Sequence, residues 1–192
     1  MNETALDYSR YFWQGGKVRL RPLRIEDAES SFAGSLDSPS RRLLQCGIEL
    51  PTSVELMRAS LADHVGCKDA EGVIVFGIET LVGEYVGALS LHSRDEKNGL
   101  FSFGVVVSRQ HRGQGYAEDA VRILLRYGFW ERRYQKCDSA CLDTNEGSIR
   151  LHQKLGFVEE GRRRREVFLD GAYHDEVLFG MTREEFDAIE RR

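Results

Sequence analysis

A short glycine-bearing loop carries the clearest chemical signal in the sequence. Residues 104–117 read GVVVSRQHRGQGYA. An apolar run is followed by a polar loop with Arg109, Arg112, Gly113 and Gly115, and the loop leads directly into an expected helix. The first N–H groups of a helix lack intrahelical partners and carry partial positive charge. The two glycines let the backbone approach a bound group closely. The loop therefore predicts an anion site suited to a pyrophosphate.

Two other phosphate-binding motifs fit this loop less well. A P-loop requires Gly-x4-Gly-Lys-Ser/Thr, and no Lys-Ser/Thr pair follows Gly115. A dinucleotide fingerprint requires a glycine where Glu118 stands, and it belongs to a leading βαβ unit. The spacing Gln110-x-x-Gly113-x-Gly115 remains, with a plain helix cap as the structural alternative.

Several ionisable side chains outside the loop have the chemistry to move a proton. His152 lies in an expected short helix, and an imidazole titrates near neutral pH. It is either a proton donor or an ordinary histidine of the helix surface. His92, Glu160 and Asp175 are candidate bases, and solvated polar positions are the alternative interpretation.

The surrounding periodicity predicts an α+β fold that positions these groups. Strands are expected at 18–21, 73–78, 85–91 and 100–107, and the last three form an antiparallel meander in which His92 lies near Ser102. Later strands are expected at 136–142, 157–158, 164–169 and 173–181, with Asp170-Gly171 as a hairpin turn. Helices are expected from Arg24, from Thr52 with Glu55 in a capping box, and at 114–130, 145–155 and 183–190.

Composition limits the function classes. The chain has 192 residues and a net charge of −4, which fits one domain and disfavours a general nucleic-acid binder. Residues 1–16 are expected to form a docked aromatic-rich tail, and 17–192 a single domain. No apolar run reaches the roughly 20 residues that span a bilayer, so we expect a cytoplasmic protein without membrane contact. The four cysteines predict reduced thiols, with neither disulfides nor metal.

In this context the loop resembles the Gln/Arg-x-x-Gly-x-Gly/Ala signature of the GNAT superfamily of N-acetyltransferases. Residues 145–157 resemble a second family segment, Asn-x-x-Ser-x-x-Leu-Tyr-x-Lys-x-Gly-Phe. The RimJ/RimL-like branch is matched by 18–27, Glu160-Gly161, Asp170-Gly171 and Tyr173-His174-Asp175. The resemblance covers roughly residues 17–186 and is weakest over 37–70. It implies the GNAT fold, a mixed, mostly antiparallel sheet of about seven strands flanked by helices.

The resemblance also implies an activity, direct transfer of acetyl from acetyl-CoA to a primary amine. The strand segment with Val105 and Val107 would meet the pantetheine arm, as would Asn145 and Ser148, although Asn145 also reads as a helix N-cap. The pyrophosphate would lie on Gln110, Arg112, Gly113, Gln114, Gly115, Tyr116 and Ala117. His152 stands where many members have a tyrosine acid. The expected catalytic residues are therefore His152, Glu160 and His92, with no metal.

The acceptor and the partners stay open. A protein N-terminus and a small-molecule amine both fit, and so does a homodimer; a non-catalytic acyl-CoA sensor is the alternative function. Four early acids could supply an acidic cleft for a cationic acceptor: Glu29, Asp37, Glu49 and Glu55. The run from Arg162 to Arg165 is interpreted as charged positions on an edge strand, because alternate side chains of a strand face opposite ways.

Overall fold

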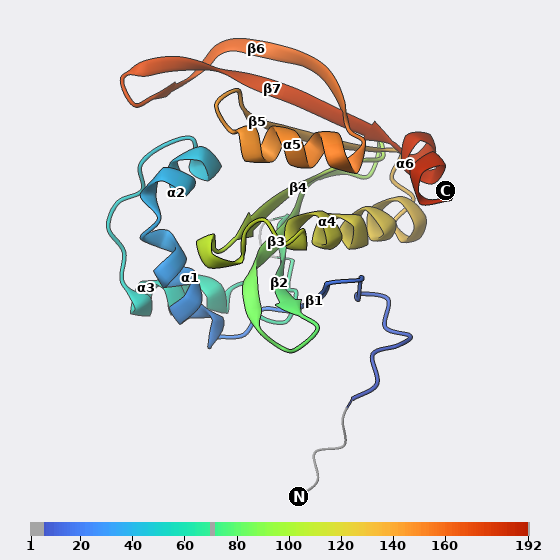
Figure 1. Cartoon of the computed structure of the whole chain (residues 1–192), viewed down its shortest axis with the longest axis horizontal. Coiled ribbons are helices and arrows are strands. Elements are labelled where there is room, and N and C mark those ends of the chain that lie inside the picture. The colour runs from blue at the N-terminus through green and yellow to red at the C-terminus, as the bar shows by residue number, and fades with distance from the viewer. Residues whose placement is uncertain (1–5, 70–71, 192) are drawn as a thin grey trace, which may run out of the picture.

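A seven-stranded sheet runs through the computed structural model, which describes residues 6–69 and 72–191 (Figure 1). Its strand order is β1-β2-β3-β4-β5-β7-β6, with β4–β5 the only parallel pair of the described strands. The strands are β1 (Val18–Pro22), β2 (Ile74–Thr80), β3 (Tyr85–Asp95), β4 (Leu100–Val107), β5 (Lys136–Leu142), β6 (Val158–Leu169) and β7 (Ala172–Thr182). The expected α+β fold, with its mostly antiparallel sheet, is confirmed.

Helices flank this sheet and join its halves. The early helices lie together to one side in Figure 1, while α4 and α5 lie alongside the central strands. The helices are α1 (Asp27–Ser35), α2 (Ser38–Gln45), α3 (Val54–Ala62), α4 (Tyr116–Arg126), α5 (Glu146–Leu155) and α6 (Arg183–Glu190). Two short elements, η1 (Arg109–His111) and η2 (Tyr127–Glu131), precede and follow α4.

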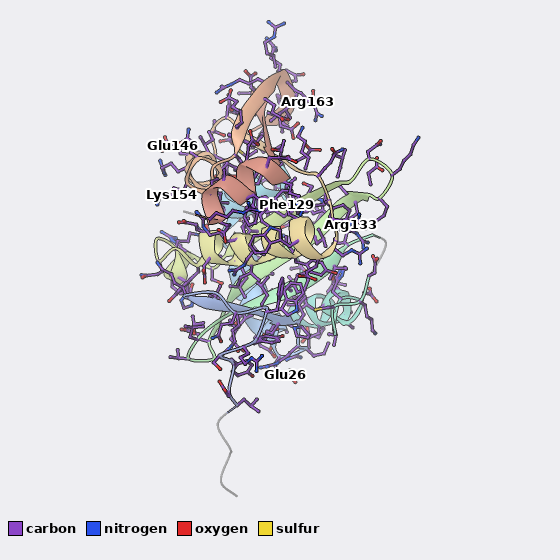
Figure 2. All side chains as sticks on the ribbon, turned by 90° about the vertical axis from the view of Figure 1, so that its right-hand side faces the viewer. Glu26, Phe129, Arg133, Glu146, Lys154 and Arg163 are labelled. Carbon is purple, nitrogen blue, oxygen red and sulfur yellow. The ribbon has the colours of Figure 1, made fainter. Side chains whose placement is uncertain are left out.

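The main core lies between the sheet and α4. Every second residue of a strand faces the same side, which brings Leu20, Ile78 and Leu89 under the apolar stripe of α4. That stripe includes Val121 and Leu124, both with no exposed surface. Figure 2 shows Phe129 in the interior beside α4 and α6. Burial of this apolar surface fixes the helix that begins at the predicted anion loop.

The opposite face carries a buried ion network that anchors α1. Arg21 donates to both oxygens of Asp27 at 2.8 Å and to Glu79 at 2.7 Å. Its partners are nearly buried, so each charge is compensated where water is scarce. This network fixes the early helices against β1 and β2.

Several element boundaries differ from the sequence-based expectation; the first helix, for example, begins at Asp27 and not at Arg24. The N-cap of α3 is Ser53, which accepts from the Leu56 N–H, so the predicted cap at Thr52 is one residue early. The helix expected over 114–130 ends at Arg126 and continues as a π turn. The strand after Phe157 is continuous through Leu169, because bulges absorb the glycine and arginine positions that suggested a break.

The chain before β1 contacts the body through aromatic side chains. Trp13 lies 5.1 Å from the ring of Phe76 and 4.8 Å from that of Tyr127, measured between centroids. The Arg19 guanidinium lies 4.1 Å from the ring centre of Tyr8. Residues 1–5 of the expected tail are outside the described residues.

Candidate functional site

The loop between β4 and α4 is built from left-handed glycines. Gly113 has φ +77° and Gly115 has φ +81°, a region that a side chain disfavours. No atom lies within 4 Å of the position that a Cβ on Gly113 would take. Gly115 caps α4 without any side-chain hydrogen bond, so the first N–H groups of the helix receive no side-chain acceptor from the cap. This arrangement suits an anion that binds to backbone N–H groups.

Arg112 lies in this loop but its guanidinium is engaged elsewhere. It donates to the Val107 carbonyl at 3.0 Å, to Ser40 Oγ at 2.8 Å and to Asp37 at 3.0 Å. The arginine therefore ties the loop to the start of α2. Asp37 compensates the positive charge of Arg112, so the backbone N–H groups supply most of the electrostatic field that would attract an anion.

A lysine that the sequence interpretation missed lies at the same loop. Lys17 Nζ donates to the Gln114 carbonyl at 2.7 Å and lies 2.7 Å from the position of a Cβ on Gly115. Asp119 of α4 fixes this segment, because its carboxylate accepts from the backbone N–H groups of Gly16, Lys17 and Val18. No local signal announces this contact across about 100 residues of chain, apart from a Gly-Gly-Lys run before the first strand.

The sheet opens next to this loop. β4 and β5 pair only through Leu100–Lys136, Phe101–Cys137 and Ser102–Asp138. Beyond Ser102, β4 continues to Val107 with only β3 as a ladder partner among the described strands. The residues expected to meet a pantetheine arm, Val105 and Val107, lie on this parted segment and are half-buried. The parted segment of β4 and the glycine loop therefore follow one another directly along the chain.

Asn145 and Ser148 lie at the start of α5, the helix that follows β5. Asn145 Oδ1 accepts from the Ser148 N–H at 3.1 Å, so the N-cap interpretation is confirmed. Gly156 ends this helix in the left-handed conformation, at φ +92°. Ser148 is half-buried and lies one turn from His152.

His152 is a buried residue, which excludes the helix-surface alternative. Only 2% of it is exposed, and its ring stacks on Phe179 at 4.5 Å with an interplanar angle of 9°. Nδ1 lies 2.8 Å from the Ser148 carbonyl, and Nε2 lies 2.8 Å from Ser139 Oγ. Burial lowers the pKa of His152, and the Ser148 carbonyl offsets part of that shift.

The two other predicted catalytic residues lie on the opposite face of the sheet. The expected pairing of His92 with Ser102 is confirmed. A Cβ on Gly104 would point at His92 Nε2, whereas the adjacent Phe103 points towards His152. Glu160 lies over Gly180, which follows Phe179 on β7, and so belongs to the face of His92. The structure therefore does not bring the three predicted catalytic residues together.

The face with His92 carries a row of polar residues at the parting. His92, Ser102, Asp138 and Gly180 are register partners across β3, β4, β5 and β7. Lys136 Nζ bridges Asp138 at 3.0 Å and Glu160 at 2.8 Å. Burial lowers the pKa of His92, and a hydrogen bond from its ring to the Phe103 backbone carbonyl partly opposes this. His92 also lines an open hollow of about 650 Å³ with Arg94 and Glu96.

Most of the early acids are ion-paired. Asp37 pairs with Arg112, Glu49 with Arg41 and Glu29 with Arg58. They do not form the row of free carboxylates that a cationic acceptor would need.

The remaining candidates lie on the β6–β7 hairpin. Asp175 accepts from the Arg165 N–H at 2.9 Å. Arg162 pairs with Glu159, and Arg163, which Figure 2 shows out on the hairpin, pairs with Glu176. The arginine run is therefore divided among local partners.

The family model for the acetyltransferase (GNAT) domain matches residues 17–158. The chain belongs to the GNAT acetyltransferase family. This GNAT protein is 34% identical over 176 residues to the SPbeta prophage-derived uncharacterized N-acetyltransferase YokL of Bacillus subtilis, covering 92% of this chain and 96% of that one. It is 26% identical to the spermidine N(1)-acetyltransferase of Escherichia coli, covering 83% of each chain.

Solved GNAT structures share the fold. The acetyltransferase (GNAT family) from Bacillus anthracis matches with a TM-score of 0.76 and 21% identity, over 89% of this chain and 98% of that one. The spermidine N-acetyltransferase from Vibrio cholerae, solved in complex with CoA and spermine, matches with a TM-score of 0.75 and 20% identity, over 88% and 97%. At these identities the likeness concerns the fold.

Two further findings concern the described residues of this GNAT protein. They contain no group of three or more histidine, cysteine, aspartate or glutamate side chains placed to hold a metal ion. Within 6–69 and 72–191, no helix combines the length and apolar character that a membrane span requires.

Proposed function

We propose that this chain moves the acetyl group of acetyl-CoA directly to a primary amine, and that it belongs to the RimJ/RimL-like branch and acts in the cytoplasm. The observation that carries the activity is the parting of β4 from β5 after Ser102 and Asp138, next to the left-handed glycine loop. The parting offers strand backbone to an extended arm, and the loop offers helix N–H groups to phosphates.

The binding residues that we propose lie in the segments that resemble the GNAT motifs. Val105 and Val107 would meet the pantetheine arm, with Asn145 and Ser148 opposite them. The loop residues Gln110, Arg112, Gly113, Gln114, Gly115, Tyr116 and Ala117 would hold the pyrophosphate. Lys17 adds a cation there, and Arg112 contributes through its tie to α2.

The polar row on the His92 face would guide the acceptor amine to the parting between β4 and β5. An amine is an ammonium at neutral pH and must lose a proton before it attacks. His92 is a suitable acceptor of that proton because burial lowers its pKa and so favours the neutral ring. Glu160, beside Lys136, is the second candidate base.

A small-molecule amine is the acceptor that we favour over a protein N-terminus. Curated relatives include spermidine N(1)-acetyltransferase, which supports a small amine as the acceptor class. Asp138 and Glu160 share one lysine, so the row keeps negative charge for a cationic substrate.

The test is turnover of acetyl-CoA with a panel of amines, read by release of free thiol. The panel contains spermidine, an aminoglycoside and a peptide with a free N-terminus. We expect turnover with at least one small amine. We also expect a CoA dissociation constant in the micromolar range, which corresponds to a standard binding free energy of about −8 kcal/mol. Turnover with the peptide alone would reassign the acceptor.

A non-catalytic acyl-CoA sensor is the second candidate. It is favoured by one observation, the occupation of the usual tyrosine position by a buried histidine. CoA binding by calorimetry without turnover on any amine would select the sensor.

A further inference from the structure

We propose that Ser139 is a catalytic residue that passes a proton from the reacting amine to the CoA sulfur. His152 is the positioning residue that holds the proton during this transfer. The inference rests on the proposed acetyl transfer. It starts from the 2.8 Å contact between Ser139 Oγ and His152 Nε2.

The place of Ser139 is the first support. It follows Asp138, the last β5 residue paired to β4, so it is the first residue of β5 beyond the parting. Its side chain is half-buried, whereas His152 is 2% exposed. Ser139 is therefore the more accessible of the two residues, and we place its hydroxyl between the imidazole and the opening, so that a group in the opening reaches the imidazole through it.

The hydrogen bonds of His152 fix the direction of the proton. The Ser148 carbonyl can only accept, so Nδ1 carries the hydrogen at this 2.8 Å contact. In a neutral ring Nε2 is then an acceptor, and the Ser139 hydroxyl donates to it. The oxygen lone pairs of Ser139 are left free to accept from a group in the opening.

The surroundings of His152 favour the neutral ring. Phe103 of β4, Phe157 and Phe179 of β7 face the imidazole. The titratable groups on the same face of β5 are the thiols of Cys137 and Cys141, and burial raises the pKa of both. On α4, Arg122 reaches α5 at the Lys154 carbonyl, and its ion pairs are with Glu118 and Glu190.

The proton balance of the transfer closes with this pair. When the neutral amine forms its N–C bond and the C–S bond breaks, one proton must leave nitrogen and one must reach sulfur. Ser139 Oγ accepts the proton from nitrogen while its own proton moves to His152 Nε2. The imidazolium then returns a proton to Oγ, and the hydroxyl gives one to the thiolate. Both side chains end as they began.

The first test needs no acetyl-CoA. Nitrogen-15 NMR of the imidazoles in the ligand-free protein at pH 7 should show His152 neutral with hydrogen on Nδ1. Ser139→Ala should move the Nε2 resonance and leave the other histidines unchanged. Hydrogen on Nε2 in the wild-type ring would overturn the proposal.

The second test compares turnover, CoA affinity and pH profile. Ser139→Ala and His152→Gln should each lower kcat at least about 100-fold, within the range of general acid–base catalysis, with CoA affinity within about threefold of wild type. Ser139→Thr keeps the hydroxyl and should recover most of the rate. Wild-type kcat should fall at acid pH because the pKa values of His152 and His92 are both lowered, and His152→Gln should remove the His152 part of this acidic limb and leave the part due to His92. The control His64→Gln, in the turn after α3, should keep both rate and limb.

The outcomes separate this proposal from the proposed function. An active wild type with an equally active Ser139→Ala would overturn the relay alone. A wild type that binds CoA but acetylates no amine would overturn the acetyltransferase activity. A stable acetyl adduct on Ser139 in the mass spectrum would make the serine a nucleophile and overturn the relay.

Discussion

The glycine loop before α4 and the pocket around His152 handle charge in opposite ways. The loop is open, and its capacity for an anion comes from helix N–H groups, with Lys17 near Gly115. The His152 pocket is lined by aromatic rings, and the imidazole hydrogen-bonds with Ser148 and Ser139. A permanent anion is best held by preorganised backbone that water can still reach. A proton in transit is best held where water is excluded, because a dry site fixes which atom is the acceptor.

Removal of the stacked ring is the largest expected perturbation of the pocket. Phe179 is 2% exposed, so Phe179→Ala should lower the free energy of unfolding by about 3–5 kcal/mol. The cavity would also admit water to His152 and raise its lowered pKa. Urea unfolding and histidine NMR measure the two effects. A stable variant with an unchanged His152 titration would show that the ring does not keep the pocket dry.

Blocking the loop is the matching perturbation of the anion site. Gly113→Glu places a carboxylate where phosphates would bind, in a left-handed position, and should weaken CoA binding at least about 100-fold. Gly66→Glu is the control, because Gly66 has φ +78° and equally open surroundings away from the loop. Calorimetry reads both variants. Equal CoA affinities would contradict the loop assignment.

Detaching the segment before β1 should affect the loop more than the pocket. Asp119→Ala removes three charge-assisted hydrogen bonds to backbone and should lower the free energy of unfolding by about 2 kcal/mol. Asp119→Ala should also weaken CoA binding, because Lys17 is no longer held at the loop. Asp119→Asn should keep part of the stability and part of the CoA affinity. An unchanged affinity in Asp119→Ala would mean that Lys17 takes no part in the loop.

Acid should weaken the fold through the buried histidines. The pKa of His152 is lowered on folding, so below about pH 6.5 the unfolded chain binds more protons than the native one. The free energy of unfolding should therefore fall as pH drops from about 6.5 through the lowered value, by at most about 1.4 kcal/mol per pH unit for each histidine. Urea unfolding at pH 7.5 and 5.5 measures the slope. His152→Gln should reduce it more than His92→Gln, and equal slopes in all three proteins would contradict the neutral buried ring.

Lys17 and Arg112, the two cations near the loop, should contribute differently to CoA affinity, and the contribution of Arg112 should be the smaller. Its partners are Asp37, Ser40 and Val107, so Arg112→Ala should weaken CoA binding by less than about fivefold, near 1 kcal/mol. Lys17→Ala should exceed that loss. The salt dependence of CoA affinity checks this ranking, and a steeper loss for Arg112→Ala would reverse it.

The loop could be predicted from the sequence because its residues are adjacent along the chain. Gly113, Gly115 and the helix that follows are set by local backbone rules, as are the cap at Asn145 and the hairpin at Asp170-Gly171. The pocket draws on β4, β5, α5 and β7, so the contact of Ser139 with His152 follows only from tertiary packing. The same limit hid Lys17 and the pairing of Arg112 with Asp37.

The parting of β4 and β5 also has a thermodynamic consequence. From Phe103 to Val107 one side of a central strand behaves as an edge within the sheet, and buried backbone groups without partners are costly. A ligand that supplies those partners acts as a substitute strand and stabilises only the folded chain. Its binding energy then reappears as resistance to unfolding, about 2.7 kcal/mol at 100 times the dissociation constant. A rise of the melting temperature with CoA concentration would measure this stabilisation.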